Sequence, residues 1–313
     1  MEEEIIISGR MNAKVDPLLH IWGWEIAFYL FVGGLAAGLL FFASFYYLRG
    51  KERVYPTAVK WAPMMAPFIL VLGLGALYLD LHHKLYFWRL YTVIRLQSPM
   101  SWGAWTLLVI TPLSMIWSAT YIREAFPKWD WKFKWIYQAE AFFIKHRKIL
   151  AWIMVFYSVI LGIYTGILLS AFNARPLWNT SILGPLFLAS GLSAGAALIM
   201  GFSKSEIERK LFSQLDLVII AVELFLIIHL FMGMMASTEV QIEAAGLFLG
   251  GKYTLPFWIF VVFLGMIVPA ILELLEMRGQ KIPVMIPVML ILFGNIMLRF
   301  IIVYAGQASR YLY

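Results

Sequence analysis

The chain has 313 residues, of which 62% are hydrophobic and 14% are charged, and its formal net charge is +7. Soluble domains carry roughly 25% charged residues, so this composition excludes a water-soluble fold. The basic residues lie in short loops between apolar runs, a pattern that orients membrane proteins and argues against nucleic-acid binding.

Apolar runs of about 20 residues identify membrane-spanning helices, and eight of them occur in the sequence. Glu2, Glu3 and Glu4 stand where a cleavable signal peptide would be basic, so we expect the first span to serve as its own insertion signal. The sequence therefore predicts an all-α integral membrane protein of eight transmembrane helices. The predicted spans are residues 22–48, 58–81, 102–122, 149–172, 180–202, 214–237, 255–275 and 283–304.

Lysine and arginine are divided unevenly between the loops, with roughly twice as many on one face of the membrane as on the other. The richest loop is the one between the third and fourth spans. Because basic loops stay in the cytoplasm, we expect both termini on the outer side.

The first and fifth spans share a glycine pattern. Gly34-Leu35-Ala36-Ala37-Gly38 matches Gly191-Leu192-Ser193-Ala194-Gly195, and a tryptophan precedes each. This repeat suggests a duplication, with a first four-helix bundle at 1–176 and a second at 177–313. The alternative is that small residues four apart simply allow close helix packing.

Polar residues gather at the outer ends of spans one to four. A charged group in hydrocarbon costs on the order of 3 kcal/mol, so each one needs a reason. Quinol oxidation releases two protons with two electrons, and a carboxylate or imidazole can accept those protons. The alternatives are an interfacial aromatic belt and ion pairs of the acids with Arg89 or Arg175. The candidate quinone-binding residues are His20, Trp24, Glu25, Asp80, His83 and Trp102.

A second polar set lies in the later spans. Asp216 and Glu223 are seven residues apart and share a helix face, while His229 points elsewhere on the same helix. The set is compatible with a broken proton path across the membrane or with buried ion pairs. Its candidate members are Asp216, Glu223, His229, Glu273 and Arg299.

Metal cofactors are disfavoured in this protein. It contains no cysteine, so it has no thiolate to bind an iron–sulfur cluster. A bis-histidine haem needs paired imidazoles inside the membrane, and only His229 lies well within a predicted span.

Several stretches together resemble the NrfD-like membrane subunits of polysulfide reductase and related molybdopterin or iron–sulfur oxidoreductases. They touch most of the spans, in the order found in that family. The stretches are HIWGWEIAFYLFVGGLAAG (20–38), LYLDLHHKLYFWRL (77–90) with SPMSWGAW (98–105), YTGILLSAFNARPLWN (164–179) with LGPLFLASGLSAGAAL (183–198), and GNIMLRFIIVYAGQ (294–307).

This resemblance implies two four-helix bundles in a prokaryotic cytoplasmic membrane, without haem. It also implies a menaquinone or ubiquinone site at the end of the first bundle nearest a ferredoxin-like iron–sulfur subunit. That subunit would exchange electrons with a catalytic subunit of molybdopterin type or with a cytochrome. His20, Glu25 and Asp80 become the main site candidates, with Trp24, His83 and Trp102 as walls or secondary hydrogen-bonding groups. Proton translocation, a transporter without quinone chemistry and a passive anchor remain open alternatives.

Overall fold

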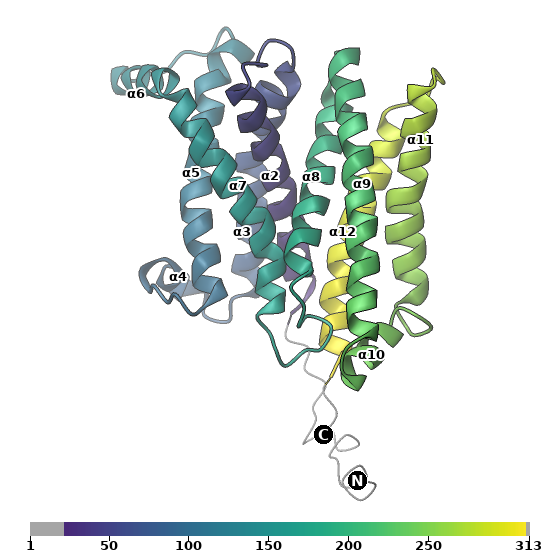
Figure 1. Ribbon diagram of the computed structural model, residues 1–313. Coiled ribbons are helices and arrows are strands. Elements are labelled where there is room, and N and C mark those ends of the chain that lie inside the picture. The colour runs from purple at the N-terminus through teal and green to yellow at the C-terminus, as the bar shows by residue number, and fades with distance from the viewer. Residues whose placement is uncertain (1–21, 311–313) are drawn as a thin grey trace, which may run out of the picture.

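The computed structural model describes residues 22–310 as a bundle of long, roughly parallel helices (Figure 1). Eight of the described helical segments are long and apolar enough to cross a membrane, which confirms the predicted number of spans. Each predicted span overlaps an observed one, because long apolar runs are a strong signal. The observed spans are α2 (Trp24–Leu48), η2, η3 and α3 together (Thr57–Asp80), α5 (Pro99–Ala125), α7 (Arg147–Ser170), α8 (Leu183–Phe202), α9 (Glu206–Met235), η5 and α11 together (Pro256–Met277) and α12 (Met285–Ala308).

Two of the spans change helix type along their length. The second begins with η2 (Thr57–Trp61, a π-helix) and η3 (Ala62–Met65, a 3₁₀-helix) before α3 (Ala66–Asp80). The seventh begins with the π-helix η5 (Pro256–Ile267) and continues as α11 (Val268–Met277). Prolines start both altered segments or lie at their junctions with the α-helices, where a missing backbone N–H disturbs the regular hydrogen-bond ladder.

Shorter helices connect the spans at the two faces of the bundle. Sequence reading treated the segments that form α6 and α10 as loops, because neither is long or uniformly apolar. α6 projects sideways beyond α5 at one face, while α4 and α10 lie at the opposite face (Figure 1). The short helices are η4 (Lys84–Tyr86), α4 (Arg89–Thr92), α6 (Lys134–Lys145) and α10 (Glu239–Gly246).

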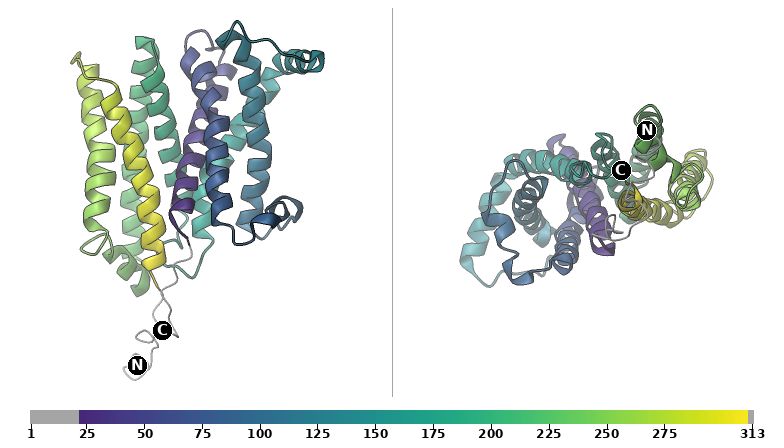
Figure 2. Two further views of the ribbon diagram at one scale, coloured as in Figure 1. Left: turned by 180° about the vertical axis from the view of Figure 1, so that it is seen from behind. Right: turned by 90° about the horizontal axis from the view of Figure 1, so that it is seen from below.

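The first four spans lie on one side of the molecule and the last four on the other (Figures 1 and 2). Helices α2 and α8 pack against each other at the centre, and each also contacts the helices of its own half. We call the two sides the first half and the second half. The exact boundary at residue 176 stays a prediction.

The repeated glycines form the contact between α2 of the first half and α8 of the second half. A Cβ placed on Gly34 would lie 3.5 Å from the Cα of Gly191, and one on Gly38 would lie 3.2 Å from the Cα of Gly195. The backbones of α2 and α8 therefore touch directly. Close packing through small residues is thus present, and it joins the two copies of the repeated motif to each other.

The described ends of the chain meet at the face that carries α4 and α10. The Trp22 backbone N–H donates to Gln307 Oε1 at 2.9 Å, and Gln307 Nε2 donates to the Trp22 carbonyl oxygen at 2.9 Å. Arg175 donates to the carbonyl oxygens of Gln307 and Ser309 at 3.0 and 3.1 Å. These bonds hold the start of α2 against the end of α12, and we call this face, where the predicted outer residues lie, the clasp face.

Candidate functional site

Most of the predicted quinone-site residues lie together at the clasp-face end of the first half. Trp24 and Glu25 occupy the first turn of α2, where an acidic side chain is favoured by the helix dipole. Asp80 is the last residue of α3, and Trp102 lies in the first turn of α5. His83 follows α3 in an exposed connection. His20 lies outside the described residues, so its predicted role stays a prediction.

Glu25 and Asp80 form an acidic pair between α2 and α3. Both side chains are half-buried, and their charges lie close enough to repel, while the nearby imidazole of His82 offsets the charge of Asp80. The ion pairs among the described residues include neither acid. Arg89, one of the two basic partners considered from the sequence, instead stacks its guanidinium over Tyr86 at 4.7 Å. Within residues 22–310 the acidic pair therefore has no lysine or arginine as an ion-pair partner.

An apolar groove of about 460 Å³ opens on the outer surface of the first half, between α5 and α7. Trp102 forms part of its wall, and the indole Nε1 donates to the Leu96 carbonyl oxygen at 2.8 Å, which fixes the ring. The groove has mainly apolar walls and few polar groups, as is typical of a site that binds an apolar ligand with a small polar head. Its lining residues are Leu96, Gln97, Pro99, Trp102, Ile160, Ile163, Tyr164 and Ile167.

Tyr164 connects this groove to the interior of the bundle. Its side chain is only 7% exposed, and its ring and hydroxyl occupy space that a Cβ on Gly103 would fill. Tyr164 also lies close enough to the buried Tyr29 of α2 to interact with it electrostatically, as does Tyr91 of α4. Tyr29 is one helical turn from Glu25. The tyrosines thus extend from the groove toward the acidic pair.

Sequence reasoning missed Tyr164, Tyr29 and Tyr91. Tyrosine is common at membrane interfaces, so none of the three is distinctive by itself. The available signal was Gly103 within the motif SPMSWG, because a glycine in the first turns of a spanning helix indicates that another group approaches closely.

The second half contains a group of buried charges. Asp216, Glu223, Glu273 and Arg299 are all buried, and Asp216 and Glu223 both lie on the inward face of α9. Asp216 lies beside Ser193 of α8 and Glu273 of α11. Among residues 22–310, neither the Asp216 nor the Glu273 carboxyl group forms an ion pair with a basic side chain.

Arg299 occupies a separate polar cluster nearer the centre of the molecule. Its guanidinium bonds to the Ser190 hydroxyl, to Asn295 Oδ1 at 3.1 Å and to the Phe187 carbonyl oxygen at 3.0 Å. Glu223 lies close enough to Arg299 for their charges to attract. A Cβ on Gly34 would come within 3.1 Å of Arg299 Nη2, so this arginine reaches the contact between the two halves.

The structure does not bring His229 into this group. Its side chain is exposed on the outer surface of α9, with Nδ1 2.9 Å from the Phe225 carbonyl oxygen and its ring 3.9 Å from the Phe225 ring centroid. The other four predicted members face inward, so His229 stands apart from the buried acids.

A second opening lies at the face opposite the clasp face, where α9 begins and α11 ends. It has a volume of about 310 Å³ and is lined by both acidic and basic side chains. Ser213 lies in its lining, is buried, has no hydrogen-bond partner among the described residues, and is three residues from Asp216 on α9. The opening therefore reaches to within one helical turn of the Asp216 and Glu273 pair.

No group of three or more histidine, aspartate or glutamate side chains within residues 22–310 is arranged to hold a metal ion. The polar groups that do converge are carboxyl, hydroxyl and guanidinium groups. Such groups move protons and bind organic ligands.

Comparison with known proteins gives matches over nearly the whole chain. The family described as "Polysulphide reductase, NrfD" matches residues 11–309. A chain of the polysulfide reductase of Wolinella succinogenes is 32% identical, over 92% of this chain and 94% of the relative. Protein NrfD of Escherichia coli is 30% identical, over 92% of this chain and 96% of the relative. A subunit of the tetrathionate reductase of Salmonella typhimurium is 29% identical, over 56% of this chain and 47% of the relative.

Proposed function

This chain belongs to the polysulphide reductase NrfD family, and we propose that it is the quinone-reactive membrane subunit of an oxidoreductase complex. The observation that carries the proposal is the apolar groove between α5 and α7, with Tyr164 at its inner side and the acidic pair beyond. Named relatives are single chains of polysulfide and tetrathionate reductases, which supports a role within an assembly.

The described residues fit a quinone. The groove offers apolar walls to an isoprenoid tail and opens on the surface that faces lipid, while Tyr164 provides a hydroxyl where the groove meets the interior. A bound menaquinone or ubiquinone would supply two-electron, two-proton redox chemistry. Trp102 would orient the ring, and Glu25 and Asp80 would accept protons at their carboxylate oxygens and pass them to the solvent at the clasp face.

The electrons need a partner, because this protein has no cysteine to hold an iron–sulfur cluster. We propose a ferredoxin-like iron–sulfur subunit at the clasp face of the first half, next to the groove. This subunit would connect to a catalytic subunit of molybdopterin type or to a cytochrome. The excess of basic loop residues on the opposite face favours a clasp face outside the cytoplasm.

Replacement of Tyr164 in the assembled complex tests the site. Tyr164→Phe removes one hydroxyl, so we expect quinol-linked turnover to fall about tenfold, the value of one strong hydrogen bond. Reduction or oxidation of an artificial dye by the catalytic subunit should be unchanged. Tyr157→Phe, two turns away on the same helix face, is the matched control and should keep full activity.

Replacement of the acids tests the proton route. Asp80→Asn and Glu25→Gln should each lower quinol-linked turnover by about a hundredfold, the usual contribution of a positioned acid or base. Wild-type rates of quinol turnover in the Tyr164→Phe, Asp80→Asn and Glu25→Gln variants together would refute the proposed site.

A second function is favoured by the buried acids of the second half. We propose that Asp216, Glu273 and Glu223 form part of a proton path that the opening beside Ser213 connects to the opposite face. Buried acidic side chains are costly in a membrane and are typical of proton relays. A transporter without quinone chemistry would use the same path, and proton movement by this protein alone in liposomes would favour it.

A further inference from the structure

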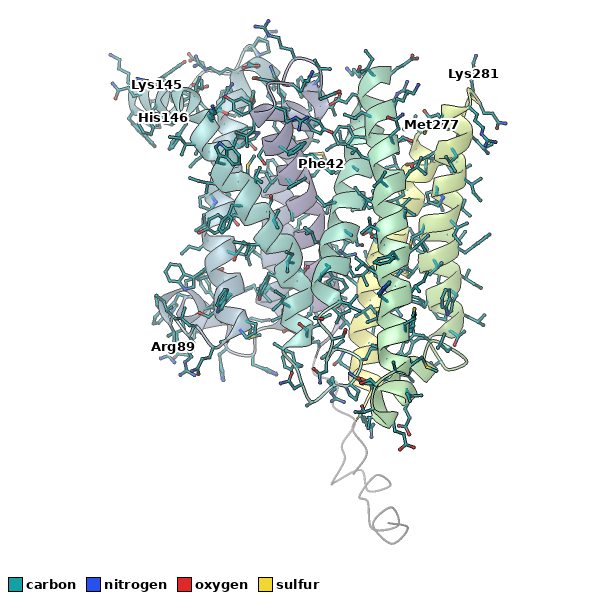
Figure 3. The ribbon with its side chains drawn as sticks, viewed as in Figure 1. Phe42, Arg89, Lys145, His146, Met277 and Lys281 are labelled. Carbon is teal, nitrogen blue, oxygen red and sulfur yellow. The ribbon has the colours of Figure 1, made fainter. Side chains whose placement is uncertain are left out.

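Helix α6 is poorly covered by the rest of the first half, and Glu140 is its one buried residue. It projects from the bundle beside the ends of α5 and α7, at the face opposite the clasp face, and Lys145 and His146 lie at the same corner (Figures 1 and 3). The helices that it mainly contacts are α5 and α7. The rest of its surface is open to the surroundings.

The only acidic residue of α6, Glu140, lies on the side that faces the bundle, where a basic side chain pairs with it. Glu140 is buried and accepts hydrogen bonds from Arg123 Nε at 2.9 Å and from Trp131 Nε1 at 3.1 Å. Arg123 Nη2 also lies 2.8 Å from the Glu140 carboxylate. The one negative charge of α6 is therefore paired inside the protein, and its outward charge is basic.

The outward side of α6 has an apolar edge and a basic edge. Trp135 and Phe142 are 67% and 57% exposed, and they lie seven residues apart on one helix face. Lys134 and Lys145 are exposed on the adjacent edge, and exposed Lys148 follows in the first turn of α7. This division is typical of a helix that lies in the plane of a membrane interface.

The apolar edge continues into the lipid-facing surface of α7. Ile149, Trp152 and Phe156 are exposed on α7 at helical spacing, directly after α6 in the sequence. α6 therefore lies at the level where the spanning helices leave the hydrocarbon. At that level, the neighbours of its basic edge are lipid headgroups.

We propose that α6 is an interfacial helix that binds anionic phospholipid, with Trp135 and Phe142 inserted among the acyl chains and with Lys134, Lys145 and Lys148 around the phosphate groups. Its occupant is phosphatidylglycerol or a phospholipid of the same charge. The site holds anionic lipid against the first half at the face opposite the clasp face.

The lysines are tested by the lipid that stays with the purified protein. The full-length protein would be purified in mild detergent from membranes that contain phosphatidylglycerol, and bound lipid would be counted by native mass spectrometry. The triple variant Lys134→Gln, Lys145→Gln and Lys148→Gln should retain several-fold less phosphatidylglycerol than wild type. A control with Lys51→Gln, Lys210→Gln and Lys281→Gln removes the same charge elsewhere on the same face and should retain the wild-type amount. Equal retention by both triple variants would overturn the proposal.

The depth of α6 is tested separately with a spin label. Because the natural sequence has no cysteine, Phe142→Cys gives a single labelling site. In nanodiscs with phosphatidylglycerol, the label should be accessible to oxygen and shielded from a water-soluble nickel chelate. A label that is open to the chelate, or that becomes shielded only when partner subunits are added, would identify this face as water-exposed or as a protein contact and would overturn the proposal.

Discussion

Gly103 has a direct effect on the candidate site because it leaves space for the ring and hydroxyl of Tyr164. Any larger side chain at this position would overlap the tyrosine. Tyr164 forms part of the groove wall, so its placement determines which polar group faces a ligand there. The glycine thus sets the position of Tyr164 in the groove wall.

Gly103→Ala should therefore displace Tyr164 and lower quinol-linked turnover about as much as Tyr164→Phe does. Overpacking of this kind typically costs about 1–3 kcal/mol, so the fold should survive. Gly75→Ala is the control, because a Cβ at Gly75 meets no atom within 4 Å. Quinol titrations of both variants in the assembled complex would measure the effect. Full activity in Gly103→Ala would contradict the role given to Tyr164.

At the residue scale, the sequence indicates which charged side chains need an explanation, but it does not indicate which groups they contact. The cost of a charge in hydrocarbon makes Asp216, Glu223, Glu273 and Arg299 conspicuous, and all four are buried. The same argument selects His229, which is exposed on the outer surface of α9. Which face of a span is inward depends on its neighbours, and a helix that is apolar on all sides gives little indication of that.

At the element scale, the contact between α2 and α8 depends on a face without side chains. A Cβ on Gly191 would lie 3.1 Å from the Cα of Gly34, and one on Gly195 would lie 2.9 Å from the Cα of Gly38. Membrane helices gain most from such close approach, because the lipid tails are as apolar as the protein surface.

Gly191→Ala should weaken this contact by about 1–3 kcal/mol, because the added methyl group pushes the two backbones apart. The midpoint of thermal unfolding in detergent, followed by loss of the monodisperse gel-filtration peak, would fall. Gly233→Ala on α9 is the control, since its Cβ meets no atom within 4 Å and alanine favours a helix over glycine. An unchanged midpoint in Gly191→Ala would contradict a direct backbone contact between α2 and α8.

The elements show where sequence prediction works and where it stops. All eight spans can be predicted from hydropathy, because a continuous run of about 20 apolar residues is typical of a membrane-spanning helix and rare elsewhere. α6 and α10 do not, since a short helix with one polar side resembles a loop in a search for apolar runs. The tyrosines between the groove and the acidic pair come from three different helices, so only the packing of those helices brings them together.

At the scale of the whole molecule, the candidate quinone site and the buried acids lie in different halves. The Arg299 cluster stands between them, because it bonds within the second half and also approaches Gly34 of the first. This arrangement allows the proposed quinone chemistry of one half to be tested separately from the proposed proton movement through the other.

Asp216→Asn and Glu273→Gln should each abolish proton movement through the second half in proteoliposomes of the complex, while quinol-linked electron transfer and the protons that it releases at the clasp face continue. The amides have nearly the shape of the acids but cannot hold the transferred proton. A pH-sensitive dye inside the vesicles would follow proton movement, with exposed Glu239→Gln of α10 as the control. Coupled proton movement at control rates in both variants would exclude this path.

The bonds between Trp22 and Gln307 have a consequence for how the protein is made. Among the described spans, α2 is synthesised first and α12 last. The contacts of α2 with α12 therefore form only after nearly all of the described spans have been translated. The glycine face of α2 has no partner until α8 is inserted. The hydrogen bonds at the start of α2 cannot form until α12 is inserted. A nascent polypeptide interrupted after the fourth span would therefore leave the glycine face of α2 without its partner helix α8.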